Sequence, residues 1–304
     1  MNDRFKFQFD TYQHRFRQPL RTSHGIWHTR EGIIISLSDG VNIAQGEIAP
    51  LSWFGSETLS QALEFCQQCP KSISLQEITQ IQDSLPCCQF AFESALLNLN
   101  QSQSDSILGD LDYCYLLPAG KAALSLWQKI YEEKHNTTFK WKIGVESLEA
   151  EIETLQQLDK VNPSNVKLRL DANGGLNITQ AQKLLAVTDS LNKIEFVEQP
   201  LSTDNFAQMQ QLSQEYSTLL ALDESIASFH QLQKASQQGW QGVFVIKAPI
   251  MGFSSRLIEY CQQYSLDVVF SSVFETKVGR NAVLKLAQQL DNSRALGFGV
   301  NYFF

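Results

Sequence analysis

The sequence predicts an α/β protein in which a (β/α) barrel, a modified TIM barrel, follows an N-terminal α+β capping domain. Apolar strand-like segments recur at regular intervals after about residue 110, helical patterns lie between them, and the preceding residues follow a different pattern. With 304 residues the chain is long enough for a barrel and an appended domain. We expect residues 1–105 to form the capping domain and residues 106–304 the catalytic barrel.

The N-terminal part begins with strands and continues with helices. Apolar and polar residues alternate over Phe5–Phe9, and the β-branched segment Gly32–Leu37 ends at turn residues. Helical patterns follow over residues 57–66 and 75–85, and Pro86 marks a turn after the second. Strands followed by helices, with no low-complexity linker behind them, predict an α+β unit packed closely against the rest of the chain.

Seven short apolar segments predict the first seven barrel strands, and the ends of the second to seventh are spaced by 24 to 29 residues. An eighth strand is expected near residues 295–298, and the final helix is expected to be short or missing because few residues follow. The segments are Tyr113–Leu117, Phe139–Ile143, Val166–Asp171, Ile194–Glu198, Leu219–Asp223, Val243–Lys247 and Asp267–Ser271.

Helical periods between these segments predict repeated parallel βαβ units. A doubly wound dinucleotide-binding sheet is the other common arrangement of such units. It would carry a Gly-x-Gly-x-x-Gly motif after its first strand, and this sequence has none there. A closed barrel is therefore favoured.

Composition and charge restrict the partners. Hydrophobic residues make up 43% of the chain, and 24 basic against 32 acidic residues give a net charge of -8, without a basic cluster for nucleic acid or a membrane surface. No apolar run is long enough for a membrane span, and the N-terminus lacks the apolar core of a signal peptide. We expect a cytoplasmic protein that acts on a small molecule; the sequence leaves its oligomeric state open.

Charged residues end several predicted strands, at the mouth where a barrel collects its catalytic residues. Asp171, Glu198 and Asp223 end strands three, four and five. An oxygen-rich cluster of this kind predicts a site for one hard divalent cation, Mg²⁺, with Mn²⁺ as the alternative ion. Without a cation, three clustered carboxylates would repel one another.

Lysines flank these carboxylates. Lys140 and Lys142 share one face of strand two because side chains alternate along a strand, and Lys247 ends strand six. A lysine near another ammonium group and a metal should have a lowered pKa, and its neutral amine can act as a general base. Singly, each charged residue could cap a helix or face solvent. Together, on five consecutive strand ends, they would carry a large desolvation cost without a function.

The motifs around these residues resemble the muconate-lactonizing subgroup of the enolase superfamily. They are Lys-x-Lys (140–142), Asp-Ala-Asn-Gly (171–174), Val-Glu-Gln-Pro (197–200), Asp-Glu-Ser (223–225) and Ile-Lys-Ala-Pro (246–249). Further motifs are similar to those of the o-succinylbenzoate synthase family of menaquinone and phylloquinone biosynthesis. These are Arg-Glu-Gly (30–32), Gly-Glu-Ile-Ala-Pro-Leu (46–51), Ser-Glu-Thr (56–58) and Ser-Ser-Val-Phe-Glu-Thr (271–276).

The resemblance implies a lyase whose substrate is 2-succinyl-6-hydroxy-2,4-cyclohexadiene-1-carboxylate. Lys142 would remove the proton alpha to the carboxylate, giving a metal-stabilised enediolate, and would then protonate the departing hydroxyl in a syn elimination of water. Lys247 would stabilise the anionic intermediate as a cation. The metal ligands would be Asp171, Glu198 and Asp223.

Other residues have less direct expected roles. Lys140 would add positive charge beside the substrate carboxylate, and Ser271 and Ser272 would contact the succinyl chain. Arg169 lies on the same strand face as Asp171 and is expected to be a structural partner of the carboxylates. The segment 19–25 resembles the capping-domain loop that closes over a barrel mouth.

Two alternative functions remain open. Lysines on opposite faces suit a two-base proton transfer as well as an elimination, so an N-succinyl or N-acyl amino acid racemase is the alternative enzyme. A dipeptide epimerase would carry Asp-x-Asp near strand eight, where this chain has Leu296–Gly299. A barrel that only binds ligands would have lost at least one of the three expected metal ligands or of the two lysines Lys142 and Lys247, and all five are present.

Overall fold

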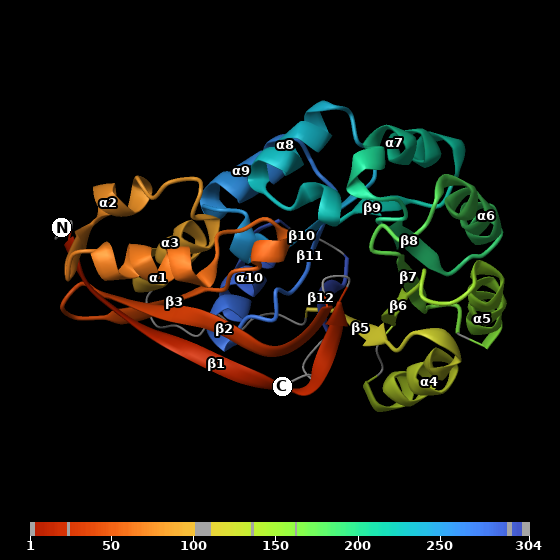
Figure 1. Cartoon of the computed structure of the whole chain (residues 1–304), viewed down its shortest axis with the longest axis horizontal. Helices are drawn as coiled ribbons and strands as arrows, with labels where there is room; N and C mark the ends of the chain where they lie inside the picture. Colours follow the sequence, from red (N-terminus) through yellow and green to blue (C-terminus); the bar gives the residue numbers. More distant parts are fainter. Residues whose placement is uncertain are drawn as a thin grey trace.

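The computed structural model describes residues 4–22, 25–100, 111–134, 137–161, 163–290 and 294–299. Figure 1 shows an N-terminal antiparallel sheet with its helices on one side of the molecule and a β/α barrel on the other. This arrangement confirms the fold class predicted from the sequence. The expected boundary after residue 105 lies outside the described residues.

The N-terminal sheet has four antiparallel strands in the order β3-β2-β1-β4. One face of β2 is apolar, and Ile33, Ile35 and Leu37 are completely buried there, within the β-branched segment that predicted a strand. Helix α3 packs against β2 and β3. The strands are β1 (Arg4–Thr22), β2 (Gly25–Ser38), β3 (Ile43–Ile48) and β4 (Ser72–Ser74), and the helices are α1 (Leu59–Gln68), α2 (Leu75–Thr79) and α3 (Pro86–Asn100).

The second expected helix is wrong beyond Thr79. In place of a single helix over residues 75–85, α2 ends at Thr79 and α3 begins at Pro86, so Pro86 starts a helix and does not mark the expected turn. Proline is favoured in the first turn of a helix, where its missing N–H is not needed. Helix α3 is difficult to predict because it is buried on several sides, and Phe90, Ala91 and Phe92 are all inaccessible to solvent.

The barrel has eight parallel strands in the order β11-β10-β9-β8-β7-β6-β5-β12, and a parallel bridge between Ser271 and Gly297 joins its two ends. Every predicted barrel strand is found to within two residues at either end, whereas the predicted N-terminal strands Phe5–Phe9 and Gly32–Leu37 are parts of the longer β1 and β2. The strands are β5 (Tyr113–Leu117), β6 (Thr138–Lys142), β7 (Lys167–Asp171), β8 (Ile194–Glu198), β9 (Leu220–Leu222), β10 (Val243–Ile246), β11 (Val268–Phe270) and β12 (Leu296–Gly299).

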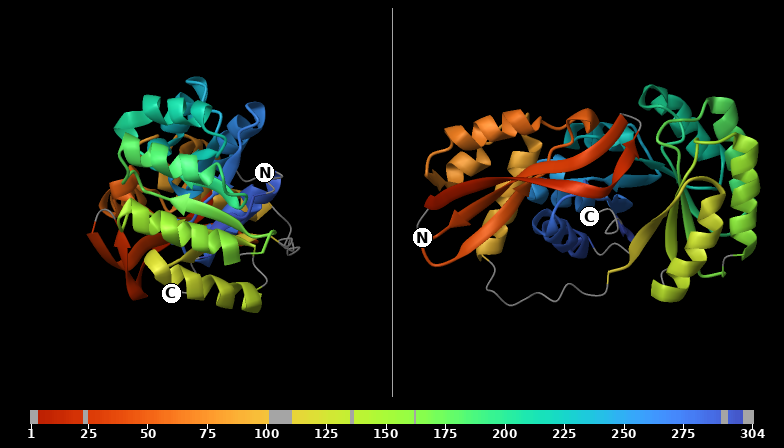
Figure 2. Two further views of the ribbon diagram at one scale, coloured as in Figure 1. Left: turned by 90° about the vertical axis from the view of Figure 1, so that its right-hand side faces the viewer. Right: turned by 60° about the horizontal axis from the view of Figure 1, so that its bottom comes forward.

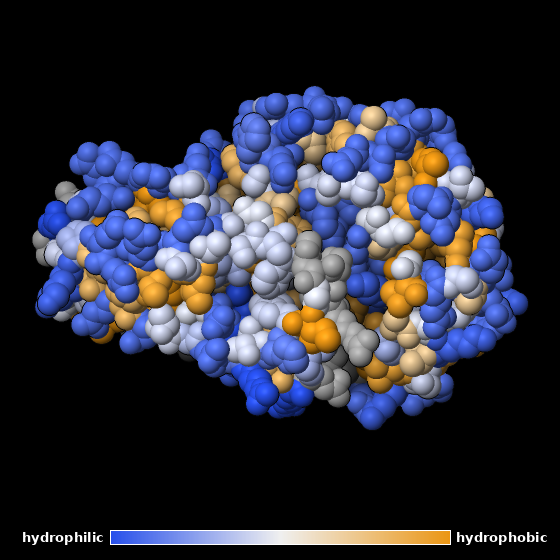
Figure 3. All heavy atoms as spheres, viewed as in Figure 1, coloured by the Kyte–Doolittle hydropathy of each residue, from blue (hydrophilic) through white to orange (hydrophobic). Residues whose placement is uncertain are grey.

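A helix follows each of the first seven barrel strands within the described residues, and Figure 2 shows α4–α7 side by side along the outside of the sheet. The expectation about a final helix concerns residues outside those described. Hydrophilic side chains cover much of the outer rim over α7 and α8 (Figure 3). The helices are α4 (Ala123–Lys134), α5 (Leu148–Val161), α6 (Ile178–Thr188), α7 (Phe206–Glu215), α8 (Phe229–Gln237), α9 (Ser254–Gln263) and α10 (Lys277–Gln289).

Apolar side chains fill the inside of the barrel below the carboxyl ends of its strands, and polar groups lie at the mouth that these ends form. The inward-facing cluster consists of Phe196, Ala221, Val243, Val245 and Val269. A larger apolar layer lies between the strands and the surrounding helices. Buried strands with this composition position the charged residues at their carboxyl ends.

All six cysteines are free thiols, five of them buried. Cys66 and Cys69, which have Cys-x-x-Cys spacing, do not form a disulfide, and burial raises the pKa of the Cys66 thiol to about 12 and that of Cys69 to about 11. Within the described ranges, no helix has the length and apolar character needed to cross a membrane.

Candidate active site

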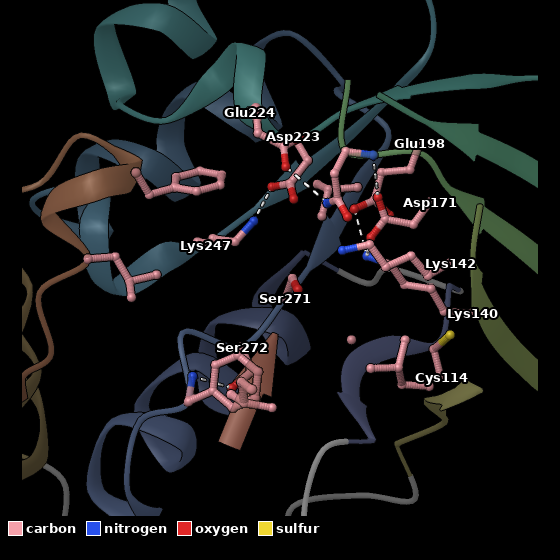
Figure 4. Close-up of a pocket in the computed structure, with 18 of the residues that line it drawn as sticks. Cys114, Lys140, Lys142, Asp171, Glu198, Asp223, Glu224, Lys247, Ser271 and Ser272 are labelled. Atoms are coloured by element: carbon pink, nitrogen blue, oxygen red, sulfur yellow. Dashed lines mark hydrogen bonds and ion pairs between the residues drawn. The ribbon is translucent and has the colours of Figure 1, made fainter. Parts of the chain in front are cut away.

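A cavity of about 350 Å³ lies at the carboxyl ends of the barrel strands, where the capping domain covers them (Figure 4). All eight site residues predicted from the sequence line it. One wall carries charged and polar side chains from the barrel, and the other is mainly apolar. The charged wall includes Lys140, Lys142, Asp171, Asn173, Glu198, Asp223, Glu224 and Lys247, and the apolar wall includes Pro19, Leu20, Trp27, Leu51, Trp53, Phe54 and Phe274.

Strand register aligns Asp171 with Glu198, while Asp223 lies two residues beyond Ala221, the partner of Glu198 on β9. Lys142 is paired with Asp171 across β6 and β7, and Asp171 is paired with Glu198 across β7 and β8. Gln199, which has a positive φ of 38°, places its side-chain oxygen where the backbone N–H groups of Asp223 and Ser225 both donate to it at 3.1 Å. This link fixes the end of β9 beside the end of β8.

Lys140 joins two of the carboxylates. Its Nζ lies 2.8 Å from Asp171 Oδ2 and 2.6 Å from Glu198 Oε1. Burial disfavours the charged lysine, but the charges of Asp171 and Glu198 outweigh this effect and raise the pKa of Lys140 well above its usual range. The lowered lysine pKa expected from the sequence concerned a lysine beside a bound metal ion, whereas this raised pKa of Lys140 arises from its pairing with the carboxylates themselves.

Glu198 is the most buried of the three carboxylates, with 1% of its surface exposed. Burial, and then the negative charge of Asp171, raise the pKa of Glu198, and the ion pair with Lys140 opposes this only in part. The carboxylate cluster therefore has less positive charge around it than three ionised groups require.

Lys247 occupies the opposite side of the cavity. Its ammonium group forms an ion pair with Asp223 and lies 4.0 Å from the centre of the Phe54 ring. Glu224, beside Asp223, accepts a hydrogen bond from Asn173 Nδ2 at 3.0 Å. Burial, followed by the charge of Asp223, raises the pKa of Glu224.

Lys142 differs from the other two lysines. It lines the cavity, and its side chain points toward the carboxylates in Figure 4, yet it forms no ion pair within 4 Å in the part of the chain that the structure describes. Its amine is thus available to a bound molecule, with Lys247 facing it across the cavity.

The remaining predicted residues are placed as follows. Ser271 and Ser272 both line the cavity. The Ser272 hydroxyl is used within its own loop, where it donates to Glu275 and accepts from the Phe274 N–H at 2.8 Å. The guanidinium of Arg169 pairs with Glu195 at 2.6 Å, so its partner is not one of the three expected metal ligands.

The donor set fits a hard divalent cation. Three carboxylates from adjacent strands face one cavity, and the raised pKa of Glu198 indicates that additional positive charge would be favourable there. As the side chains are arranged, no group of three or more acidic, histidine or cysteine side chains in the described residues is close enough to hold a metal ion. Lys140 and Lys247 pair with these carboxylates instead.

Sequence reasoning assigned no role to Asn173, Glu224 or Phe54. Asn173 and Glu224 belong to motifs that carried the resemblance, and their position beside Asp171 and Asp223 could have indicated that they line the site. Phe54 belongs to the capping domain and is far from Lys247 in the sequence, so no sequence spacing connects the two residues that meet in the structure.

The N-terminal and barrel regions each match a known family. Residues 11–99 match the family described as MenC, N-terminal domain, and residues 122–300 match the family described as enolase C-terminal domain-like. The o-succinylbenzoate synthase of Thermosynechococcus vestitus is 37% identical, covering 97% of this chain and 92% of the relative. That of Aliivibrio fischeri is 28% identical, covering 85% and 78% respectively.

Solved structures show the same relationship. The o-succinylbenzoate synthase from Thermosynechococcus elongatus, complexed with Mg in its active site, superposes with a TM-score of 0.93 and 36% identity, covering 98% of this chain and 94% of the other. An L-Ala-D/L-Glu epimerase from Bacillus subtilis has a TM-score of 0.80 at 20% identity, covering 98% and 90%, and shares the fold. Sequence and structure agree that this chain belongs to the o-succinylbenzoate synthase family of the enolase superfamily.

Proposed function

We propose that this protein catalyses the Mg²⁺-dependent syn elimination of water from 2-succinyl-6-hydroxy-2,4-cyclohexadiene-1-carboxylate. The product is o-succinylbenzoate, an intermediate in the synthesis of menaquinone or phylloquinone. The observation that carries this proposal is the Lys142 amine, which forms no ion pair with any described residue and faces a carboxylate cluster in a cavity lined by both domains, within a chain of this family.

The reaction begins with removal of a proton alpha to a carboxylate. Such a proton is very weakly acidic, so the site must stabilise the negative charge that develops on the carboxylate oxygens. Lys142, as the neutral amine, takes the proton and leaves an enediolate. The resulting ammonium then donates a proton to the departing hydroxyl, and the ring becomes aromatic. A single group that serves both steps requires the proton and the hydroxyl to leave from the same face, which accounts for a syn elimination.

Lys247 acts as a fixed cation on the other side of the enediolate. Its pairing with Asp223 and its contact with Phe54 hold its charge in place, which favours electrostatic stabilisation over the role of a second base. Lys140 contributes positive charge beside the substrate carboxylate.

Asp171, Glu198 and Asp223 would hold the Mg²⁺ ion. When bound, the ion supplies positive charge to carboxylate oxygens that become more negative during the reaction. The chain's own contribution is to place three oxygen donors on neighbouring strands.

The cavity suits a small carboxylate with an unsaturated ring. Its volume of about 350 Å³ is typical of small-molecule sites. Aromatic side chains on the capping side would contact the apolar ring, while Ser271 is within the cavity for the succinyl chain.

We further infer that the chain divides into domains near residue 105 and works in the cytoplasm on a small-molecule substrate. A net charge of -8 and a site lined by both domains support a role without nucleic acid or membrane as partner.

Ultraviolet absorbance tests the reaction directly. The purified protein, supplied with the cyclohexadiene carboxylate, should form o-succinylbenzoate rapidly with Mg²⁺ and should stop when a chelator is added. Failure to form product while Mg²⁺ is bound would overturn the proposal. The same preparation would then be assayed for racemisation of N-succinyl amino acids.

A further inference from the structure

Phe54 of the capping domain covers the ammonium group of Lys247 in the barrel. The Nζ atom lies 4.0 Å from the ring centre, and the same ammonium pairs with Asp223. We propose that Phe54 is a positioning residue for Lys247, through which the capping domain sets the location of a charge that the barrel uses in catalysis. This inference rests on the proposed function, in which Lys247 stabilises the anionic intermediate.

A ring face is a suitable partner for this lysine. An ammonium group is attracted to the negative face of an aromatic ring, more strongly when water is excluded. The lysine side chain is long and has many rotamers. A second contact restricts these rotamers beforehand, so less conformational entropy is lost when the ammonium group stabilises the intermediate. Asp223, the other partner, is also an expected Mg²⁺ ligand. The ring cannot serve as an oxygen donor to Mg²⁺, so its contact with Lys247 does not compete with the metal.

The loop that carries Phe54 is fixed from the capping side. Phe54 ends a short 3₁₀ helix, Ser52–Phe54. Arg30, whose guanidinium is buried, donates to the Pro50 oxygen at 2.8 Å, and the Ser56 hydroxyl oxygen accepts from the Leu51 N–H at 2.8 Å. Both ends of the segment are therefore held by hydrogen bonds.

The same loop rests on the barrel. Gly55 follows Phe54 with a φ of +115°, a conformation that side chains rarely adopt. A Cβ atom at Gly55 would lie 3.5 Å from the Cβ of Ala227 in the barrel. Neighbouring Trp53 packs edge to face against Trp27, with ring centres 4.8 Å apart. The ring of Phe54 is thus placed by contacts with both domains.

Phe54→Leu and Phe54→Tyr distinguish the effect of the aromatic ring face from the effect of side-chain size. Leucine keeps an apolar side chain but has no ring face, and we expect kcat to fall roughly two- to thirtyfold, the range of a cation–ring contact, with KM changed by less than about twofold. Tyrosine keeps the ring face and should retain most of kcat. Phe65→Leu is the matched control, because Phe65 contacts Phe92 in the same domain and does not line the cavity. Melting temperatures of all variants with Mg²⁺ provide a readout independent of activity.

A double-mutant cycle with Lys247→Ala decides whether the two residues act together. In the Lys247→Ala background, Phe54→Leu should have little further effect on kcat. Equal losses in both backgrounds would overturn the positioning role while leaving the proposed function intact. A rise in KM with unchanged kcat would also overturn it, since the ring would then act only in substrate binding. If Lys247→Ala alone had full activity, the proposed role of Lys247 itself would fail.

Discussion

Glu47 of the capping domain accepts hydrogen bonds from the backbone N–H of Thr276 in the barrel, at 2.8 and 2.9 Å for its two oxygens. Thr276 is the N-cap of α10, and the Gly279 N–H in the first turn of that helix also donates to Glu47, at 2.9 Å. A carboxylate suits this position because the first turn of a helix has N–H groups without partners and a partial positive charge. One buried side chain therefore satisfies the start of a barrel helix from the other domain.

Replacing Glu47 by alanine should destabilise the whole protein. The substitution leaves buried N–H groups of Thr276 and Gly279 without a partner, which should lower the free energy of unfolding by about 2–4 kcal/mol. Urea unfolding followed by circular dichroism measures the change. Glu47→Gln keeps one acceptor oxygen and should lose less. Equal stability of the alanine variant and the original protein would show that the contact contributes nothing.

Lys142→Ala should remove catalysis and leave the fold nearly intact. Loss of a general acid–base group lowers turnover by about 10²- to 10⁴-fold, and Lys142 makes no ion pair, among the described residues, whose loss would unfold the barrel. Product formation and the melting temperature are the two measurements. Lys183→Ala, at an exposed position on α6, is the matched control. Substantial turnover by the Lys142 variant would exclude it as the base.

Mg²⁺ should raise the melting temperature in a concentration-dependent manner, because a ligand that binds only the folded state stabilises it. Asp223→Asn removes one charge from the cluster and should weaken this effect, whereas Asp204→Asn at an exposed position should not. A thermal melt over a Mg²⁺ series, with chelator as the starting point, measures both. An identical rise in the Asp223 and Asp204 variants would argue against the proposed ligand set.

Glu275 should make stability depend on pH. Burial, together with the nearby charge of Glu47, raises the pKa of Glu275 from 4.5 to about 7. Between these values the folded state holds a proton that the unfolded state has released, so stability falls as pH rises from about 4.5 to 7.

Glu275→Gln removes this titration. Urea unfolding at pH 5 and at pH 8 gives the free energy of unfolding of both proteins. From pH 5 to pH 8, the free energy of unfolding of the variant should rise by about 1–3 kcal/mol relative to that of the original protein. The control is Glu259→Gln, on the exposed side of α9. A stability difference that is the same at both pH values would contradict the assignment.

The barrel and its charged residues could be predicted because parallel strands are buried on both faces. A segment such as Val243–Ile246 is therefore uniformly apolar, and the charge that ends it stands out. Helix α3 could not be predicted in the same way, since a helix buried on several sides lacks the polar face that produces a periodic pattern.

The motifs that indicated the family have varied roles in the structure. Glu47 holds α10, and Glu57 accepts from the backbone N–H groups of Cys87 and Cys88 at the start of α3. Arg30 fixes the Pro50 oxygen. These residues join elements that are distant in the sequence, and sequence spacing alone does not reveal such contacts. Their motifs identified the family correctly, although these three side chains do not line the cavity.

The seam of the barrel has a consequence for its motions. Within the described residues, β11 and β12 meet at the single bridge between Ser271 and Gly297, supported by the Ser272 N–H, which donates to the Gly297 oxygen at 3.3 Å. Opening the barrel at this seam breaks fewer backbone hydrogen bonds than separating two strands with a continuous ladder, such as β6 and β7. The amide hydrogen of Ser272, which donates across the seam, should therefore exchange with solvent faster than those in the middle of β7, and local breathing of the catalytic domain should begin beside the cavity.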